Sequence, residues 1–226
     1  MKILALESAT FGCSAAVLVD GRVAAHEADF KANGATEVLV PMLARVLDRA
    51  GLKIADIERL AVTVGPGHFT GLRAGLAVAR GLALATGLPV VPATTLDVVA
   101  SATPATARAG KRLLVALDSK RAEPYLQMFD AQLSSLGPPL SMTPAAFAAT
   151  VPAGDPVAVV GDAAVPLVDA LSQAGISASL LDGALRPDAA ALAILAASRQ
   201  PGSGDIRPFY LHPPAIKAPA SSRVGA

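Results

Sequence analysis

Short apolar runs separated by turn residues dominate the first thirty positions of the chain. Ile3–Leu6 is continuously apolar, which is typical of a buried strand. Cys13–Val19 is a second such run, and the Asp20-Gly21 pair that follows it is a frequent hairpin turn. Arg22–Asp29 then continues as a third strand. The pattern predicts antiparallel strands at the start of the chain.

Apolar residues next recur with helical spacing. Positions 38/39, 42/43 and 46/47 are all apolar, which predicts a helix from near Thr36-Glu37 to Gly51. Pro41 interrupts this pattern, because proline lacks the N–H group that a helix interior needs. We therefore expect the helix either to start near Val40 or to be kinked at Pro41.

A glycine-rich stretch then joins a strand to a second helix. Leu60–Val64 reads as the strand, and Gly65-Pro66-Gly67 favours a tight turn after it. Thr70 is the expected N-cap of a helix over Leu72–Ala85, and Gly87 is its expected C-terminal stop.

This second helix carries almost no charge. Arg73 and Arg80 are its only charged residues, and their spacing of seven places them on one face. A helix that is apolar nearly all round must be covered on both sides. It could be a core helix on its own sheet, a helix whose outer face docks a partner helix, or a helix whose N-terminus binds phosphate. The glycine spacing matches neither common phosphate-loop motif, which disfavours the third interpretation.

The second half of the chain begins as the first half does. Leu114–Ser119 echoes Ile3–Ser8, since both are apolar runs that end in a carboxylate and a serine. Each is followed by a return strand, Cys13–Val19 in one case and Pro124–Phe129 in the other. The echo indicates either a duplicated lobe or chance similarity. The remaining expected elements are strands over Pro89–Pro92, Val157–Val160 and Ile176–Leu181, and helices over Thr95–Ala102, Val165–Ala174 and Pro187–Ser198.

Hairpins combined with alternating strands and helices predict an α/β fold with two lobes. We place the first lobe at residues 1–105, with the glycine turn and its helix, and the second at residues 106–212. The loop 103–110 separates them. Arg207–Leu211 is expected to form an ordered clamp, and residues 213–226 a disordered tail.

Composition narrows the classes of function. Of the 226 residues, 53% are hydrophobic and 16% charged, and the net charge is +1 without a basic stripe, so the chain is a poor candidate for binding RNA or DNA alone. One cysteine, Cys13, fits a reducing compartment. Glu7 comes too early for a signal peptide and no long apolar run follows, so we expect a cytoplasmic protein without a membrane span.

The candidate chemistry centres on two carboxylates at strand ends. Glu7 and Asp118 occupy equivalent places in the two halves. In two-lobed folds of the sugar-kinase type, such acids face nucleotide, magnesium or water in the cleft. The alternative is that each accepts backbone N–H bonds in a hairpin turn. The charged stretch 118–125 is either a solvated turn or a polar docking loop. The three histidines have no metal-binding spacing.

The glycine stretch also resembles a known motif. Residues 65–75 look like the Gly-Pro-Gly-Ser-Phe-Thr-Gly-Leu-Arg-x-Gly signature of the bacterial TsaB (YeaZ) family. Residues 3–8, 118–125 and 208–214 resemble further segments of that family, so the resemblance covers nearly the whole chain. His68 stands where the family has serine and Glu7 where it has aspartate. Both departures weaken the case for independent metal or nucleotide chemistry.

The resemblance implies a two-lobed actin-like ATPase fold of the sugar kinase/Hsp70/actin type with duplicated β-sheet lobes. It also implies a non-catalytic scaffold role in making N6-threonylcarbamoyladenosine at position 37 of tRNA. The implied partners are a TsaD-type paralogue and a TsaE-type ATPase, with a homodimer when the chain is alone. ATP and metal are expected on the partners and no cofactor on this chain, while tRNA is met only through the complex.

The two predicted helices are expected to form the partner interface. The rival hypothesis is an autonomous ATP-dependent enzyme or a metalloprotease-like hydrolase of the same fold. The residues expected at the interface are Val38, Met42, Leu43, Leu72, Arg73, Gly75, Leu76, Ala79, Arg80 and Ala83.

Overall fold

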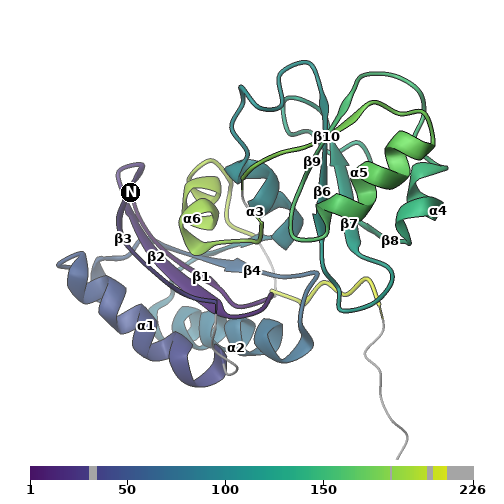
Figure 1. Cartoon of the computed structure of the whole chain (residues 1–226). Coiled ribbons are helices and arrows are strands. Elements are labelled where there is room, and N and C mark those ends of the chain that lie inside the picture. The colour runs from purple at the N-terminus through teal and green to yellow at the C-terminus, as the bar shows by residue number, and fades with distance from the viewer. Residues whose placement is uncertain (31–34, 184, 203–205, 213–226) are drawn as a thin grey trace, which may run out of the picture.

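The computed structural model of the chain describes residues 1–30, 35–183, 185–202 and 206–212, which fold into two lobes, each with a five-stranded sheet (Figure 1). The strands of the first sheet are β1 (Lys2–Glu7), β2 (Cys13–Val19), β3 (Arg22–Asp29), β4 (Arg59–Thr63) and β5 (Val90–Ala93). Those of the second are β6 (Arg112–Leu117), β7 (Tyr125–Phe129), β8 (Leu140–Ser141), β9 (Val157–Val160) and β10 (Ala178–Leu180). The helices are α1 (Ala35–Arg49), α2 (Phe69–Thr86), α3 (Thr95–Ala102), α4 (Pro144–Ala148), α5 (Ala164–Gln173) and α6 (Ala189–Ala197), with a 3-10 turn at Ile54–Asp56.

The two sheets repeat one topology. Their strand orders are β3-β2-β1-β4-β5 and β8-β7-β6-β9-β10 when both are read from the corresponding edge. In each, the central strand pairs antiparallel with the strand that follows it and parallel with a later strand on its other side. This repetition confirms the duplication that the two similar apolar runs predicted, and with it the two-lobed α/β fold.

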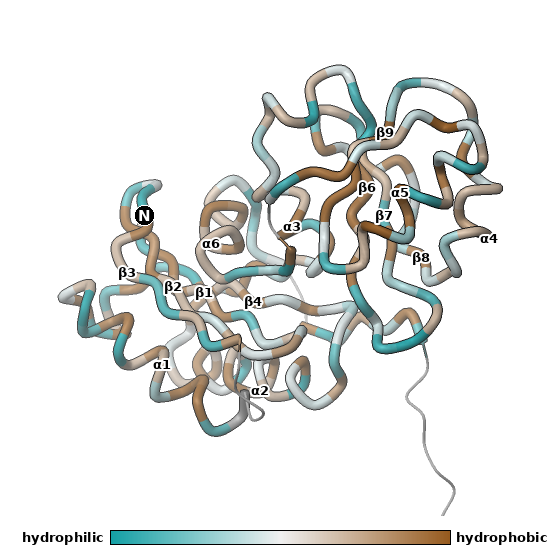
Figure 2. The backbone as a smooth tube through the Cα atoms, in the orientation of Figure 1, coloured by the Kyte–Doolittle hydropathy of each residue, from teal (hydrophilic) through white to brown (hydrophobic). Residues whose placement is uncertain are grey.

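Strand β1 is buried on both faces because each face has its own helical layer. Leu4 and Leu6 pack with α1 and α2 on one side. Ile3 and Ala5 pack with α6 on the other. Side chains alternate between faces along a strand, so a strand covered on both sides shows no polar alternation. The central strands are accordingly among the most hydrophobic parts of the backbone (Figure 2).

Helix α2 begins two residues earlier than an N-cap at Thr70 would require, so that prediction is wrong. His68 is the N-cap, and its carbonyl oxygen accepts the Leu72 N–H at 2.9 Å. Gly87 ends the helix in the left-handed region at φ 74°, and its N–H reaches the Ala83 carbonyl at 2.8 Å. The C-terminal stop is therefore confirmed.

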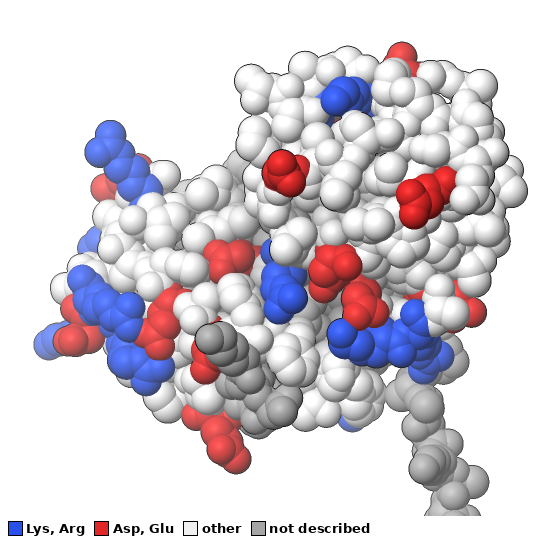
Figure 3. All heavy atoms as spheres, in the orientation of Figure 1, with Lys and Arg blue, Asp and Glu red and all other residues white. Residues whose placement is uncertain are grey.

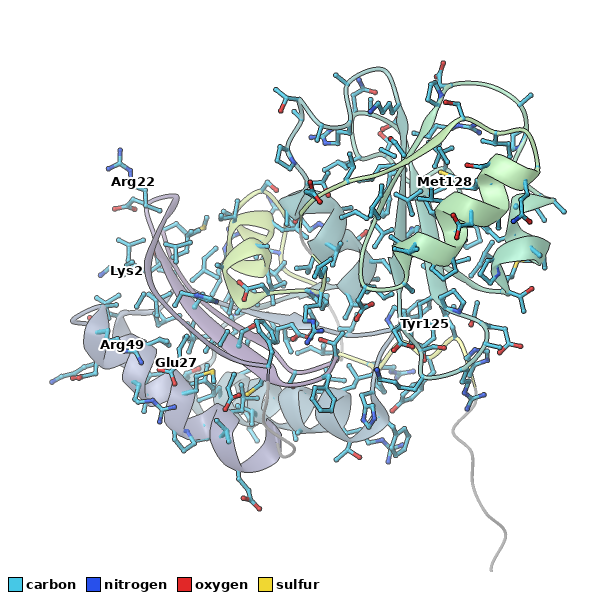
Figure 4. The ribbon with its side chains drawn as sticks, viewed as in Figure 1. Lys2, Arg22, Glu27, Arg49, Tyr125 and Met128 are labelled. Carbon is cyan, nitrogen blue, oxygen red and sulfur yellow. The ribbon has the colours of Figure 1, made fainter. Side chains whose placement is uncertain are left out.

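Helix α1 continues through Pro41 and does not start near Val40. The helix packs on β2 and β3. On β3, the Glu27 carboxylate pairs with the guanidinium groups of Arg45 and Arg49, and Figure 4 shows Glu27 and Arg49 pointing toward one another. This tertiary packing outweighs the loss of one intrahelical hydrogen bond at the proline.

The later elements differ from expectation in their bounds, their number and their placement. Strand β10 is shorter than Ile176–Leu181, and β8 and α4 had no predicted counterpart. Helix α6 starts after Pro187 because the Asp188 carboxylate accepts the Ala190 N–H at 2.8 Å. The helix also lies on the first sheet, although it falls in the range assigned to the second lobe. Sequence ranges and spatial lobes therefore do not coincide.

Helix α3 contacts both sheets. Val98 packs in the core of the first sheet, while Leu96, Val99 and Ala100 pack against the second. Within the described ranges, no helix is long and apolar enough to span a membrane. The predicted tail, residues 213–226, lies outside the described residues.

Candidate functional site

The glycine turn after β4 is held by hydrogen bonds to two neighbouring segments. The His68 N–H donates to the Ala9 carbonyl at 2.5 Å, which ties the turn to the loop after β1. Thr95, the first residue of α3, donates its N–H to the Gly65 carbonyl at 2.9 Å and its hydroxyl to the Pro66 carbonyl at 2.7 Å. The turn is therefore a junction between β1, β4 and α3.

Close packing explains the glycines of this motif. A Cβ atom on Gly67 would lie 2.0 Å from the Ala9 carbonyl oxygen, and one on Gly71 would lie 2.1 Å from that of Ser8. On Gly75 it would lie 2.4 Å from Ser8 Oγ, which itself donates to the Gly71 carbonyl at 2.8 Å. No side chain fits at such distances. The glycines of the motif therefore allow the start of α2 to pack closely against residues 8 and 9.

Most of the predicted interface residues lie inside the chain's own core, while their assignment to a partner interface stays a prediction. The helices turn their regular apolar stripe toward the sheet, so most of these side chains expose little surface, although Leu43 also lines the open groove between the two helices. Val38 and Ala83 are partly buried. The buried members of the set are Met42, Leu43, Leu72, Gly75, Leu76 and Ala79.

Arg73 and Arg80 are exposed but engaged within the chain. Arg73 Nε donates to the Tyr210 hydroxyl at 3.1 Å, and its guanidinium carbon lies 3.8 Å from the centre of the Phe69 ring. Arg80 donates to the carbonyl of Ile206. Both arginines therefore hold the segment 206–212, which confirms the predicted ordered clamp around residues 207–211 and removes them as free charges at an interface edge.

A different surface of α1 and α2 is open. An apolar groove of about 390 Å³ runs between the two helices. Val40, on its rim, is 53% exposed, and Leu84 at the end of α2 is 90% exposed. A Cβ atom on Gly81 would meet no atom within 4 Å. The residues that line the groove are Leu4, Val40, Leu43, Ala44, Leu47, Ile54, Val78, Gly81 and Leu82.

Sequence reasoning missed most of this groove because it followed the stronger stripe that faces the sheet. The signal that could have found it is the second apolar stripe of α2, Val78, Gly81 and Leu82, which lies next to the buried one. Only the packing of α1 beside α2 shows that this second stripe remains uncovered.

A second candidate site is a small cleft where the lobes meet. It measures about 170 Å³, below the 300–1,000 Å³ typical of small-molecule sites. Charged side chains gather along this boundary, while much of the visible face of the second lobe is uncharged (Figure 3). The cleft is lined by the loop after β1, the glycine turn, the loop after β6, and Tyr125, Asp162 and Arg186.

Glu7 does not line this cleft, so the structure does not bring it together with Asp118 there. Its side chain is fully buried, and Oε1 accepts the N–H groups of Ala9 at 2.7 Å and Thr10 at 3.3 Å. Burial raises the pKa of Glu7 to about 8, against the opposing effect of these two hydrogen bonds. The carboxyl group is therefore largely protonated at neutral pH, which is a poor state for a cation ligand.

Asp118 does line the cleft, but its carboxylate is already occupied. Oδ1 accepts the Lys120 N–H at 2.7 Å, and Oδ2 pairs with Lys120 Nζ at 2.6 Å. These contacts with Lys120 lower the pKa of Asp118 despite its partial burial. The arrangement is that of a hairpin-turn cap. Among the described residues, no three His, Cys, Asp or Glu side chains converge as a metal site.

The chain is similar to proteins whose names refer to threonylcarbamoyladenosine in tRNA. The family model described as "TsaD: tRNA N6-adenosine threonylcarbamoyltransferase" matches residues 32–150. The tRNA threonylcarbamoyladenosine biosynthesis protein TsaB of Escherichia coli K12 is 39% identical over 126 residues, which are 55% of this chain and 53% of that protein. An uncharacterized protein of Mycobacterium tuberculosis is 32% identical over 161 residues, 70% of this chain and 71% of that protein. The chain thus matches about half the length of the first of these relatives.

Solved structures agree with these relatives. YeaZ from Pseudomonas aeruginosa superposes with a TM-score of 0.72 at 26% identity, covering 87% of this chain and 90% of that one. The ethanolamine utilization protein EutJ from Carboxydothermus hydrogenoformans gives a TM-score of 0.50 at 12% identity, over 86% of this chain and 89% of that one, a likeness of fold alone.

Proposed function

The chain belongs to the TsaB (YeaZ) family, and from this membership we propose that it serves in N6-threonylcarbamoyladenosine synthesis on tRNA as a subunit that docks and activates a TsaD-type transferase. In this role it is a scaffold, and it works in the cytoplasm with its partners. A TsaE-type ATPase joins the larger complex, and tRNA contacts this chain only through that complex.

The apolar groove between α1 and α2 carries the proposal. Every residue that lines it is apolar, and Val40 at its rim is 53% exposed. The fully buried centres of protein interfaces are likewise depleted of charged residues. Gly81 in the groove has no side chain and the exposed Ala77, one turn before it on α2, has a small one, so a partner helix can approach the backbone closely at these two positions.

The nature of the partner follows from the match to the transferase model. That match spans residues 32–150, which include both α1 and α2. A TsaD-type transferase therefore has elements related to these two helices. Related helix pairs can pack against each other around a pseudo-two-fold axis, as identical surfaces do in symmetric dimers. We assign the groove to that helix pair.

The test is co-purification and calorimetric binding of the transferase from the same organism. Val40→Asp should weaken binding at least tenfold, because it places a charge against the apolar surface that the partner would cover. Val165→Asp is the matched control, since Val165 is 58% exposed on α5 of the other lobe. Unchanged binding by Val40→Asp, or an equal loss with both variants, overturns the assignment.

We further propose that ATP and metal are held by the partner subunits. The small cleft, the pairing of Lys120 with Asp118, and the raised pKa of Glu7 support this division of roles. ATP turnover and metal content of the isolated chain provide the measurement. Robust hydrolysis or stoichiometric metal would instead favour an autonomous ATP-dependent enzyme or hydrolase.

A further inference from the structure

The segment 206–212 crosses from the first lobe to the second as an extended strap (Figure 1). It begins at the Ile206 carbonyl, which accepts from Arg80 on α2. The Phe209 N–H then donates to the Val64 carbonyl at 2.7 Å, at the end of β4. Gly65 has φ +108°, and a Cβ atom there would lie 2.4 Å from the Phe209 carbonyl oxygen. The absence of a side chain at Gly65 therefore allows the strap to pack directly against the glycine turn.

Tyr210 anchors the strap to the first turn of α2. Its ring stacks on that of Phe69, with centroids 5.7 Å apart and planes 27° from parallel. Its hydroxyl accepts from Arg73 Nε at 3.1 Å, and the same guanidinium lies over the Phe69 ring at 3.8 Å. Stacking, a cation–π contact and a hydrogen bond thus converge on one side chain.

His212 anchors the strap to the second lobe. Its Nε2 lies 2.7 Å from the Oγ of Ser141 on β8. The Ser141 hydroxyl has one proton and donates it to the Glu123 carbonyl at 2.9 Å, so His212 Nε2–H is the donor in this contact. The His212 ring also lies 6.1 Å from that of Tyr125, which Figure 4 shows at the end of the second lobe nearest the strap.

Both anchors adjoin opposite walls of the cleft between the lobes. Tyr125 lines it from the second lobe, and Pro66, Gly67 and His68 line it from the first. The strap contacts Tyr125 on one side. On the other side it contacts Gly65 in the glycine turn, and Val64 and Phe69 on either side of that turn. The chain also passes between the lobes after α3 and before α6, so the strap is a third connection.

We propose that the strap holds the two walls of the cleft at a fixed separation. Through Tyr210, this separation is coupled to the contacts that the strap makes with Phe69 and Arg73 on α2. Two covalent crossings alone allow the lobes to hinge. The third crossing restrains that hinge through side-chain contacts at Tyr210 and His212. Any molecule that displaces Tyr210 from Phe69 and Arg73 therefore opens the cleft.

Distances between spin labels across the cleft test this proposal in the full chain. One label at His68→Cys reports the wall of the first lobe, and a second at Arg121→Cys, next to the lining residue Lys120, reports that of the second lobe. The native Cys13 is fully buried and should not react with the label. We expect His212→Ala and Tyr210→Ala to lengthen and broaden the distance distribution. Tyr210→Phe keeps the stacked ring and should give a smaller change.

Ser198→Ala is the control, because it removes one exposed hydrogen bond, Ser198 Oγ to the Leu195 carbonyl at 2.9 Å, away from the strap. Its distance distribution should match that of the parent. Unchanged distributions in both strap variants overturn the proposal, even if their melting temperatures fall, because the strap would then stabilise the fold without setting the cleft. If Tyr210→Ala does not fold, His212→Ala decides the question.

Discussion

Glu7 shows how burial converts a charged residue into a neutral turn anchor. Its carboxyl oxygen Oε1 holds the backbone of residues 9 and 10, and Oε2 has no hydrogen-bond partner among the described residues. A buried oxygen without a partner is costly, and an ionised one more so. The side chain therefore keeps its proton, and the pKa rises to about 8.

We predict that this proton makes the fold less stable as pH rises. The pKa of Glu7 is about 8 when folded and near 4.5 when unfolded, so the folded state retains a proton that the unfolded state loses between these values. The free energy of unfolding should therefore fall across that window. Glu7→Gln cannot ionise, and urea denaturation should find it more stable than the parent above pH 8.

The same comparison well below pH 4.5 is the control, because Glu7 is then protonated in both the folded and the unfolded state. The difference in unfolding free energy should be smallest in that pH range. A parent protein whose stability is flat between pH 5 and pH 8 would show that Glu7 is not buried in this way.

At the scale of elements, α6 is fixed to the first sheet by polar contacts at its N-terminus. The Asp188 carboxylate caps the helix through the Ala190 N–H at 2.8 Å and pairs with His26 Nε2 on β3 at 2.9 Å. The Ala189 N–H donates to Ser14 Oγ at 2.9 Å. The hydrogen bond to Asp188 raises the pKa of His26. Burial acts to raise the pKa of Asp188, but its contacts with His26 and with the backbone N–H groups at the start of α6 together lower it.

We predict that Asp188→Ala destabilises the protein by about 0.5–2 kcal/mol, the usual cost of losing an N-cap. The cost should be larger near pH 6 than near pH 8.5. The His26 pairing contributes fully below the unfolded histidine pKa and disappears as pH rises through the raised folded value. Solvent screening keeps this pH-dependent part small, because both side chains are partly exposed.

Denaturant unfolding of Asp188→Ala at the two pH values measures the effect. His26→Gln is the companion variant, since it leaves the cap in place and should remove most of the pH dependence. An equal cost for Asp188→Ala at both pH values would mean that the His26 pair adds nothing beyond the cap.

At the scale of the whole molecule, the two lobes are joined by more than the polypeptide linkers. Helix α3 packs into both cores, and the strap contacts both lobes. The α1–α2 groove lies on the side of the first sheet opposite α6, and nothing in the described chain covers it. An uncovered apolar groove of this kind favours association.

We predict that the isolated chain self-associates through this groove at micromolar concentrations. Analytical ultracentrifugation should detect a species of twice the monomer mass that grows with concentration. Val40→Asp should return the chain to a monomer, whereas Val165→Asp should not. A chain that stays monomeric throughout would argue against a homodimer in the absence of the partner.

The pattern of residues was sufficient to predict most elements and the duplicated architecture. Continuous apolar runs mark β1 and β6 because both are covered on two faces, and Gly87 marks the end of α2 because a left-handed residue is needed there. The first residues of the helices were predicted less accurately than their last residues. Thr70 looked like a cap, but the backbone contact between His68 and Ala9 begins the helix earlier.

Local sequence alone determined where strands and helices form, because hydrophobic periodicity and turn chemistry act over a few residues. Tertiary structure decided which apolar stripe of α2 faces the sheet and which stays open. It also placed α6 on the first sheet, set the protonation of Glu7, and directed Arg73 and Arg80 to the strap. Each of these depends on contacts between residues far apart in the chain, which no local pattern encodes.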